Sequence, residues 1–562
     1  MHLKHASVLA IILLAATATA CSGPAGEPPV PEFSEAAIAG HVKILASDEF
    51  EGRFPGTKGE DLTITYIADQ FKAVGLKPGS PDGTYFQDVP LVGITADPST
   101  ALTFATGVAT RTLRFKDDVV AWTKRVQDEV RLDASDVVFV GYGVHAPEYG
   151  WDDYKGTDVS GKTLVMLVND PPVPDPATPG QLDPKTFGGR AMTYYGRWTY
   201  KYEVGAEKKA AAVFIVHETE PAAYPFSVVQ GKTGEQFDLV APDKNMSRVA
   251  VEGWITHGQA IELFKMAGLD YEKAKAAAAT REFRPIPMGV TASMTIRNTI
   301  RTIDSRNVVG TLEGSDPALK HEYVIYTSHW DHFGIGDPVD GDTIYNGALD
   351  NASGIGGLIE LGRAFAALEE PPKRSILFLA VTAEEQGLLG SDYYARMPLY
   401  PLEKTLAVVN MDSLNIYGKT SDLRVVGLGH SDLDDYATRA AAAQNRTPKP
   451  DPEPERGGYF RSDHFPFAKQ GVPAINAGGG NDFIGRPADY GKQVRDAYTS
   501  KHYHQPSDEY RPDWDLSGAV QDLQIYFDIA YHVANAETFP AWKAGSEFKS
   551  KREKMLAPGD RR

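Results

Sequence analysis

The segment SILFLAV (residues 375–381) decides the fold class, because it is almost continuously apolar and rich in residues that favour strands. A strand with one solvent-facing side alternates polar and apolar residues, so this run indicates a strand that is covered on both faces. Residues 405–410 (TLAVVN) repeat the pattern, residues 323–326 (YVIY) form a shorter run, and residues 354–368 have helical spacing. This alternation of strands and helices along the chain predicts an α/β domain, a three-layer αβα sandwich with a mixed, mostly parallel sheet.

The composition is that of a folded protein with more than one domain. The chain has 562 residues, of which 42% are hydrophobic and 23% are charged, so a wholly disordered protein is excluded. The formal net charge of −18 at pH 7 disfavours binding to nucleic acids, because the phosphate backbone is itself negative. The single cysteine, Cys21, excludes an internal disulfide and a cysteine-based zinc or iron–sulfur site. Any metal must therefore be bound by His, Asp and Glu.

The N-terminus has the pattern of a secretion signal. Lys4 precedes an apolar segment at residues 8–20, which is too short to cross a bilayer comfortably. The sequence ATAC, which ends at Cys21, resembles a bacterial lipoprotein signal, in which that cysteine is acylated. We therefore expect a signal peptide at residues 1–20, a Pro- and Gly-rich tether at residues 21–32, and an exported protein. The expected location is the cell envelope, as a lipoprotein of the periplasm or outer membrane, and the alternative is a secreted protein.

Charged side chains follow the predicted strands at their carboxyl ends, where open α/β sheets bind ligands. Taken singly, each such residue has an ordinary explanation, such as a helix cap or a solvated surface. Several carboxylates in one cleft would repel one another unless a cation compensated their charge. Two histidines with several carboxylates, and no thiolate, suit one or two divalent metal ions, zinc above all. The candidate residues are His329, Asp331, Asp350, Glu384, Glu385, Asp412 and His504.

Six short motifs occur in an order that resembles the co-catalytic zinc aminopeptidases of metallopeptidase family 28. The similarity covers residues 33–533, apart from an insertion, and includes LASDEFEGR at residues 45–53. The insertion, with VGYG at residues 140–143, resembles the protease-associated (PA) domain that many members carry. The six motifs are HxD (329–331), DNASG (350–354), EExGxxGS (384–391), NMD (410–412), SDH (462–464) and HxPSD (504–508).

The resemblance implies a pair of zinc ions as cofactors. Asp350 matches the carboxylate that bridges the two ions. Glu385 and His504 would complete one zinc site, and His329 and Asp412 would complete the other. Such a pair lowers the pKa of a bound water and polarises the carbonyl of the peptide bond that is cleaved.

The resemblance also implies roles for three residues that do not bind metal. Glu384 matches the general base that takes a proton from the attacking water and returns it to the leaving amine. Asp331 matches the carboxylate that orients and polarises His329. Tyr459 lies where some relatives have a phenol that stabilises the tetrahedral oxyanion.

The domain boundaries follow from these assignments. Residues 33–117 form the first part of the catalytic domain, and residues 118–295 form the inserted PA domain. Residues 296–545 form the second part of the catalytic domain and carry the metal site. Residues 546–562 are rich in Lys and Arg and lack periodicity, so we expect a flexible tail there.

Some nearby residues have both a structural and a functional interpretation. We expect His332, His464 and His502, which lie beside motif residues, to support the ligands or the structure rather than to bind metal. Within the insertion, an aromatic cluster either packs beneath a loop or forms a wall or lid over the substrate cleft. Its members are Tyr194, Tyr195, Trp198, Tyr200 and Tyr202.

The leading functional hypothesis is an exported zinc aminopeptidase that removes N-terminal residues from peptides. A carboxypeptidase or dipeptidase on the same fold is the alternative, and it needs a cation such as Arg456 or Arg461 to bind the substrate carboxylate. A glutaminyl-cyclase-like acyltransferase shares the fold, but the cyclases that we compare lack a PA domain. A non-catalytic receptor-like module is disfavoured because the candidate ligands and Glu384 are all present. The oligomeric state and the preferred substrate residue stay open.

Overall fold

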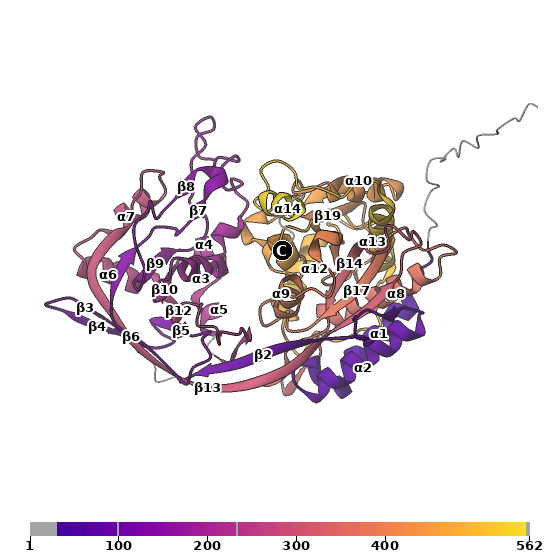
Figure 1. The fold of residues 1–562 in the computed structure, drawn as a ribbon, viewed down its shortest axis with the longest axis horizontal. Helices are drawn as coiled ribbons and strands as arrows, with labels where there is room; N and C mark the ends of the chain where they lie inside the picture. The colour runs from indigo at the N-terminus through magenta and orange to yellow at the C-terminus, as the bar shows by residue number, and fades with distance from the viewer. Residues whose placement is uncertain (1–30, 98–100, 232–233, 558–562) are drawn as a thin grey trace, which may run out of the picture.

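The computed structural model describes residues 31–97, 101–231 and 234–557 (Figure 1). The predicted signal peptide, Cys21 and most of the predicted tether lie outside these residues. Within these three ranges, no helix combines the length and the apolar character that crossing a membrane requires.

The main sheet has a parallel centre and antiparallel pairings toward its edges. β14 (Tyr323–His329) lies between β17 (Ser375–Val381) and β18 (Thr405–Asn410) and runs parallel to both. β18 also pairs in parallel with β21 (Ala474–Ala477), whereas β13 (Ile286–Leu312) pairs antiparallel with β17. The three central strands are those that the sequence predicted. The outer strands are β1 (Lys77–Pro78), β2 (Phe86–Ala96), β11 (Gln236–Leu239), β19 (Asp422–Val426) and β20 (Thr447–Pro450).

Alternate side chains of the central strands enter two different apolar cores. On β14, Val324 and Tyr326 pack into one core, whereas Tyr323 and Ile325 pack into the other. Helices therefore cover both faces of the sheet, and the predicted three-layer α/β architecture is confirmed (Figure 1). The first core includes α1 (Glu35–Leu45), α2 (Lys58–Ala73), α8 (Ser353–Ala366), α10 (Leu433–Ala443) and α13 (Ser517–Asn535), and the second includes α9 (Leu389–Arg396) and α11 (His464–Lys469).

Local sequence explains two features of these helices. Ser34 caps α1, because its Oγ accepts a hydrogen bond from the backbone N–H of Ala37 at 3.2 Å. On α8, a Cβ at Gly357 would lie 3.0 Å from Cδ2 of Leu523 on α13. Glycine at this position therefore allows α8, which follows the Asp350 motif directly, to pack closely against α13.

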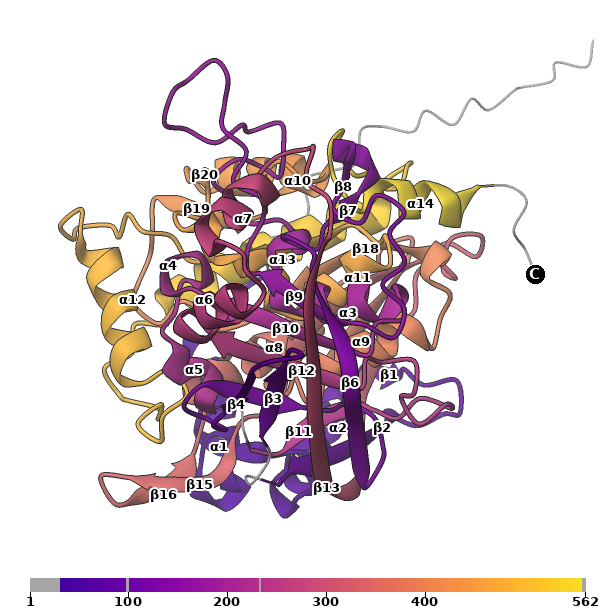
Figure 2. The same cartoon turned by 90° about the vertical axis from the view of Figure 1, so that its left-hand side faces the viewer.

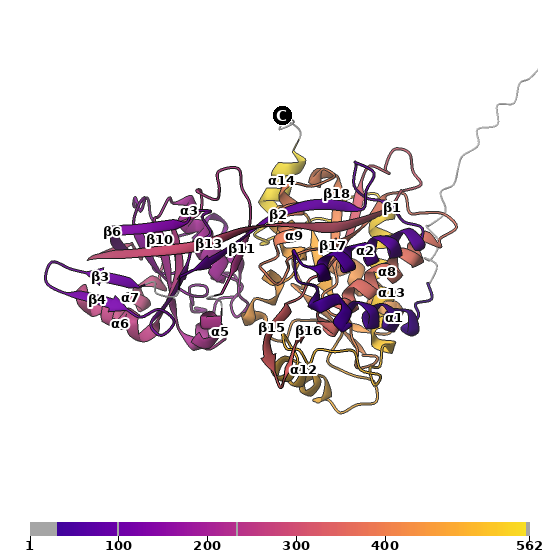
Figure 3. The ribbon, with the colours of Figure 1, turned by 90° about the horizontal axis from the view of Figure 1, so that it is seen from below.

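β13 connects the main domain to the insertion. It is 27 residues long. At about 3.3 Å per residue, a strand of this length spans roughly 90 Å. Residues 298–308 of β13 pair with β2, and its N-terminal part pairs with β6 (Glu129–Phe139). Figure 3 shows β2 and β13 running side by side from the main domain toward the insertion.

The insertion is a second α/β unit with its own sheet (Figure 2). Its other elements are β3 (Leu102–Ala105), β4 (Thr110–Leu113), β5 (Val119–Trp122), β9 (Thr163–Leu167), β10 (Ala212–His217), β12 (Val251–Thr256), α3 (Trp198–Glu207), α6 (His257–Met266) and α7 (Tyr271–Ala278). The strand order is β4–β3–β13–β6–β9–β10–β12–β5, in which β6, β9, β10 and β12 run parallel.

The insertion begins earlier than the sequence predicted. β3 and β4 were expected in the first part of the main domain, within residues 33–117, but β3 pairs with β13 in the sheet of the insertion. The predicted boundary between residues 295 and 296 falls inside β13, where the strand is continuous. Because one strand serves both sheets, the chain shows no change of composition where one domain gives way to the other.

The C-terminal segment is also more ordered than predicted. Residues 549–556, which were expected to lie in a flexible tail, form α14 (Lys549–Leu556). The guanidinium of Arg552 is buried and donates to the carbonyl oxygens of Leu402 at 3.0 Å and Thr405 at 2.7 Å. These bonds fasten the helix to the start of β18.

The shorter elements are β7 (His145–Ala146), β8 (Trp151–Asp152), β15 (Gly334–Val339), β16 (Asp342–Tyr345), α4 (Thr219–Ala222), α5 (Phe226–Gly231) and α12 (Tyr490–Lys501).

Candidate metal centre

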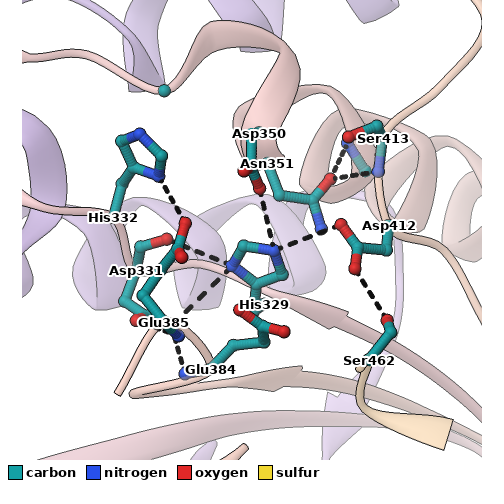
Figure 4. Close-up of polar contacts among 12 residues, drawn as sticks. His329, Asp331, His332, Asp350, Asn351, Glu384, Glu385, Asp412, Ser413 and Ser462 are labelled. Carbon is teal, nitrogen blue, oxygen red and sulfur yellow. Dashed lines mark hydrogen bonds and ion pairs between the residues drawn. The ribbon is translucent and has the colours of Figure 1, made fainter. Parts of the chain in front are cut away.

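The predicted metal ligands converge beyond the carboxyl ends of the parallel strands, and Figure 4 shows His329, Asp350, Glu385 and Asp412 among them. His329 is the last residue of β14, and Asp412 follows the end of β18. Glu385 lies in the loop after β17, and Asp350 lies in the helical turn that leads into α8. His504 comes from the loop after α12. The sheet therefore brings together side chains that are far apart in sequence.

Asp350 lies between two histidines. Its Oδ1 is 3.2 Å from His329 Nε2, and its Oδ2 is 3.3 Å from His504 Nε2. His329 Nε2 is also 3.4 Å from Asp412 Oδ1, and His504 Nε2 is 3.2 Å from Glu385 Oε2. The five side chains thus form two groups that share Asp350.

His332, which the sequence analysis expected to support the ligands or the structure, is a further possible donor at this centre. Its ring is fully buried, and its Nδ1 lies 2.7 Å from Glu385 Oε1. The nitrogen and carboxylate atoms of His332, Asp350 and Glu385 lie close enough together to surround one ion. The HxD motif alone did not reveal this contact, because the following residue reaches Glu385 only through the tertiary fold.

The residues present fit a divalent metal. Nε2 of His329, of His332 and of His504 is buried without a hydrogen-bond partner among the described residues. Imidazole nitrogens and carboxylate oxygens, with no thiolate, are a donor set that suits zinc. A cation would also compensate the negative charge of Asp350, Glu385 and Asp412, which lie within one cluster.

The electrostatics of the cluster separate the two adjacent glutamates. Burial raises the pKa of Glu384 well above its usual value, and the opposing effect of His329 does not cancel it. Burial also acts on Glu385, but the imidazoles of His504 and His332 outweigh it and lower the pKa of Glu385 to about 2. Neighbouring carboxyl groups with such different proton affinities suit different roles, one as a proton carrier and one as an ionised ligand.

Asp331 supports the loop that carries these glutamates. Its Oδ1 accepts a hydrogen bond from the backbone N–H of Glu384 at 3.0 Å, and its Oδ2 accepts one from Glu385 at 3.3 Å. Nδ1 of His329 lies 3.1 Å from the carbonyl oxygen of Asp331 and 3.9 Å from its Oδ1. The backbone of Asp331 therefore contacts His329, whereas its carboxylate, which was predicted to orient that ring, binds mainly the glutamate loop.

Other polar residues fix the remaining ligands. Asp508 accepts hydrogen bonds from the backbone N–H groups of Leu349 at 3.1 Å and Asp350 at 3.0 Å. The hydroxyl of Ser462 donates to Asp412 Oδ2 at 2.7 Å (Figure 4). These contacts give the HxPSD and SDH motifs a structural purpose, because each motif contributes a residue that holds a ligand segment.

Arg53, from the LASDEFEGR segment, joins three loops beneath the cluster. Its side chain is buried, and burial lowers the pKa of its guanidinium to about 10. The hydrogen bonds that this guanidinium donates link the end of α1, the residue after His329, and the turn before Asp350. The acceptors are the backbone carbonyls of Trp330 (2.8 Å), Leu45 (2.7 Å), Asn346 (2.6 Å) and Gly347 (2.8 Å).

Tyr459 does not direct its hydroxyl to the carboxylate cluster. The hydroxyl donates to the carbonyl of Ala474 at 3.3 Å, and the ring lies in the second apolar core against His464, with ring centroids 4.6 Å apart. The predicted oxyanion contact therefore finds no support in its surroundings, and the position of His464 agrees with a structural role. His502 places Nδ1 3.0 Å from Ser507 Oγ, which also agrees with such a role.

Tyr503 is a phenol that the sequence analysis missed. Its ring stacks on His504 with centroids 3.7 Å apart and an angle of 26° between the planes. Although 37% of the residue is exposed, desolvation of its hydroxyl raises the pKa of Tyr503 well above the usual value, and the negative charges of Asp350 and Glu385 add to the effect. Tyr503 follows no recognisable motif, and only its position before His504 in the chain could have drawn attention to it.

A cavity of about 530 Å³ opens beside the glutamates, between the main domain and the insertion. Glu384, Glu385 and Tyr503 line it from the main domain. Tyr194 and Trp198 are among the lining residues from the insertion, and the Tyr194 ring lies 4.8 Å from the Phe465 ring of the main domain. The predicted aromatic cluster thus contributes to a wall of this cavity as well as to packing.

The part of the chain that carries the centre matches a known family. Residues 307–528 match the model for Peptidase family M28. Aminopeptidase NAALADL1 of Mus musculus is 33% identical over 131 residues, which are 22% of this chain and 16% of that protein. Aminopeptidase YwaD of Bacillus subtilis is 30% identical over 176 residues, 31% of this chain and 35% of its own length. The chain thus spans only a minor part of these curated relatives.

The chain is also similar to a carboxypeptidase homolog and to an aminopeptidase of known structure. The glutamate carboxypeptidase 2 homolog of Caenorhabditis elegans is 31% identical over 204 residues, which are 34% of this chain and 24% of that protein. Among solved structures, an aminopeptidase from Aneurinibacillus sp. strain AM-1 is 18% identical with a TM-score of 0.46, and the match covers 89% of this chain and 94% of that one. The segment that matches Peptidase family M28 contains His329, Asp350, Glu384, Glu385, Asp412 and His504.

Proposed function

We propose that this chain is a zinc-dependent exopeptidase, an aminopeptidase that removes N-terminal residues from peptides. One observation carries the proposal: Asp350 presents its two carboxylate oxygens to two different imidazoles, those of His329 and His504, at 3.2 and 3.3 Å. A carboxylate in this position suits the bridge of a two-metal hydrolase site. The match to Peptidase family M28 over the same residues, and the names of the aminopeptidase relatives, support the same activity.

The proposed reaction uses Glu384 as the general base. Two zinc ions bound by His329, Asp412, Asp350, Glu385 and His504 would polarise the scissile carbonyl and lower the pKa of the attacking water. Glu384 lines the cavity in which the peptide would lie, so its carboxylate can take a proton from the water and transfer it to the leaving amine. The hydrogen bond from its backbone N–H to Asp331 holds the loop in place.

The export, anchoring and domain assignments remain part of the proposal. The signal-like residues 1–20 and Cys21 support an exported lipoprotein of the cell envelope, in the periplasm or outer membrane, and a secreted protein is the alternative. The VGYG sequence supports a PA domain as the identity of the insertion. Peptides are the proposed partners.

Carboxypeptidase or dipeptidase activity is the second candidate. Arg461, which such an enzyme would need as a carboxylate-binding cation, lines the same cavity as Glu384. Arg456, the other candidate from the sequence, also lines this cavity but pairs with Glu453 at 3.0 Å.

A panel of one tripeptide with free or blocked ends tests these activities. With zinc present, an aminopeptidase should cleave the free and the C-amidated peptide and should leave the N-acetylated peptide intact. A carboxypeptidase should show the reverse preference, and a dipeptidase should cleave none of these tripeptides but should cleave the corresponding dipeptide. If the zinc-loaded protein hydrolyses neither a tripeptide nor a dipeptide, the proposed function is wrong.

A further inference from the structure

The basic residues of the cavity between the two domains fall into two classes. Lys124, Arg197, Arg248, Arg396, Arg456, Arg461 and Lys469 line this cavity. Most of them have a partner that neutralises or satisfies them within the chain. The partnered ones are Arg248 with Asp238 (2.8 Å), Arg396 with Asp392 (2.8 Å), Arg456 with Glu453 (3.0 Å), Lys469 with Glu203 (2.5 Å) and Lys124 with the carbonyl of Phe237 (2.5 Å).

Arg197 and Arg461 form the other class. Neither has an ion pair with a carboxylate in the described ranges of the chain. Nε of Arg197 is shielded from solvent and has no hydrogen-bond partner among those residues. Burial, together with the positive charge of Arg461, lowers the pKa of Arg197 to about 10, so the two guanidinium groups lie within electrostatic reach of each other. Two like charges held this close are unfavourable unless an anion joins them.

The two arginines come from different domains, and the stem of Arg197 is packed while Arg461 is exposed. Arg197 belongs to the insertion, directly before α3, whereas Arg461 follows a short helical turn of the main domain. A Cβ at Gly457 would lie 3.3 Å from Cδ of Arg197, so the arginine stem lies against the segment that leads to Arg461. The backbone N–H of Met192 donates to the carbonyl of Pro454 at 3.1 Å and fastens the insertion to that same segment.

The pair also shares its cavity with residues of the metal centre. Glu384, Glu385 and Tyr503 line the same cavity as both arginines. The charge of Arg461 acts on the Tyr503 hydroxyl, and Tyr503 stacks on His504. A carboxylate bound by the arginines would therefore share this cavity with a peptide bound at the metal centre.

We propose that Arg197 and Arg461 together bind a carboxylate of the peptide substrate and make the protein selective for peptides that carry one within the cavity. The inference rests on the proposed peptidase function, which it deepens by naming a substrate class. Guanidinium groups recognise carboxylates through paired N–H···O bonds, which give both charge and geometric specificity. Either the C-terminal carboxylate of a short peptide or the side chain of Asp or Glu supplies this chemistry.

Matched peptides test the substrate class with the full-length, zinc-loaded protein. Leu-Gly-Gly is compared with Leu-Gly-Gly-amide, and Leu-Glu-Gly-amide is compared with Leu-Gln-Gly-amide. We expect kcat/KM to be about 10-fold or more higher for the carboxylate member of at least one pair, because a charge-assisted contact is lost in the other member. A preference in the first pair assigns the C-terminal carboxylate, and a preference in the second assigns the acidic side chain. Equal values in both pairs overturn the proposal.

Three variants assign the preference to the arginines. Arg461→Met should abolish the preference between the members of each pair, and the rate on a neutral leucine anilide, which carries no carboxylate, serves as the reference. Arg197→Lys keeps a positive charge at a partly buried position and should reduce the preference, with thermal unfolding as the check on folding. Arg456→Met is the matched control, since that arginine already pairs with Glu453, and it should leave the preference intact. If Arg461→Met keeps the full preference, the proposal fails.

A binding measurement separates this proposal from the proposed activity. In Glu384→Gln, calorimetry should show tighter binding of Leu-Gly-Gly or Leu-Glu-Gly-amide than of the uncharged partner. If the charged peptide binds more tightly but the wild type hydrolyses no peptide, the carboxylate site is supported and the peptidase function is rejected. Hydrolysis without any preference in rate or binding would support the peptidase and reject the carboxylate site.

Discussion

The carboxylate of Asp331 accepts a hydrogen bond from the backbone N–H of Glu384, with 3.0 Å between Oδ1 and N. The bond ties the loop after β14 to the loop after β17, so a residue two positions after the histidine ligand His329 fixes the position of the proposed base. The other carboxylate oxygen of Asp331, Oδ2, accepts a hydrogen bond from the backbone N–H of Glu385 at 3.3 Å. The arrangement explains why a carboxylate is needed at this position, since two N–H groups require two acceptors.

Asp331→Asn should lower kcat, because an amide offers one acceptor oxygen and its NH₂ group would face a backbone N–H. The expected loss of activity or of zinc affinity is about 10- to 100-fold, as is typical for partners of metal ligands. Steady-state kinetics and zinc content per chain measure the two effects. Asp88→Asn, at an exposed residue that pairs with Arg306, is the control and should change neither. Wild-type kinetics in Asp331→Asn would show that the loop needs no such support.

Glu384→Gln should lose turnover and keep its metal. Removing a general base lowers kcat by about 100- to 10,000-fold. Zinc binding should remain near the wild-type level, because Glu385 is the neighbour that lies 3.2 Å from His504 Nε2. Single-turnover kinetics and metal analysis on the same sample make the measurement. Loss of zinc together with activity would mean that Glu384 is a ligand rather than the base.

Removal of metal should destabilise the fold as well as stop the reaction. Without a metal ion, Asp350, Glu385 and Asp412 remain clustered, with the imidazoles and the nearby Arg53 guanidinium to compensate them. Calorimetry should give a lower Tm after chelation, and zinc at 1,000 times its Kd should add about 4 kcal/mol to the free energy of unfolding. Magnesium serves as the control ion, because it binds imidazole poorly. A Tm that does not respond to chelation or zinc would count against the centre.

Arg53→Lys should destabilise the protein although the charge is kept. A lysine presents a compact ammonium group and cannot reach all four carbonyls that the guanidinium binds. Leaving buried carbonyls without donors should lower the free energy of unfolding by about 3 kcal/mol. Urea titration measures the change, with the exposed Arg511→Lys as the control. A change no larger than that of the control would mean that the loops hold their positions without Arg53.

Stability should fall as the pH rises across the range in which Glu547 titrates. Burial raises the pKa of Glu547 from 4.5 to about 8, and the nearby Asp170 and Glu148 add to the shift. Between these values the folded state binds more protons than the unfolded state, so this group's contribution decreases with rising pH and is fully unfavourable above pH 8. Glu547→Gln removes the titration and can still accept the N–H of Tyr194, which lies 3.4 Å from Oε1 in the wild type.

The measurement for Glu547 is the urea midpoint from pH 5 to pH 9. Glu547→Gln should give a shallower decline than wild type and higher stability than wild type above pH 8. The exposed Glu537→Gln is the control and should follow the wild-type curve. Parallel curves for Glu547→Gln and wild type would show that Glu547 does not titrate in this range.

The apolar strands and the order of the polar motifs were sufficient to predict the sandwich and the ligand cluster. Residues 375–381 could be read as a strand covered on both faces, and Glu385 and Asp412 follow the ends of such strands, whereas Asp350 and His504 were assigned from the resemblance to family 28. The start of the insertion could not be predicted, because β13 pairs with strands of both domains and carries no break. The helix at residues 549–556 was missed because its contacts, through Arg552, are with distant carbonyls.

The sequence by itself determined the chemistry of this protein: an acidic chain whose strand ends supply imidazoles and carboxylates but no thiolates. The tertiary structure decided which of these groups meet. It brought His332 to Glu385, directed the Asp331 carboxylate to the glutamate loop and turned the Tyr459 hydroxyl toward a backbone carbonyl. It also left Arg197 and Arg461 facing one cavity from two domains. The physical reason is that residue type and spacing set local conformation and donor chemistry, whereas contacts between distant loops depend on how the sheets pack.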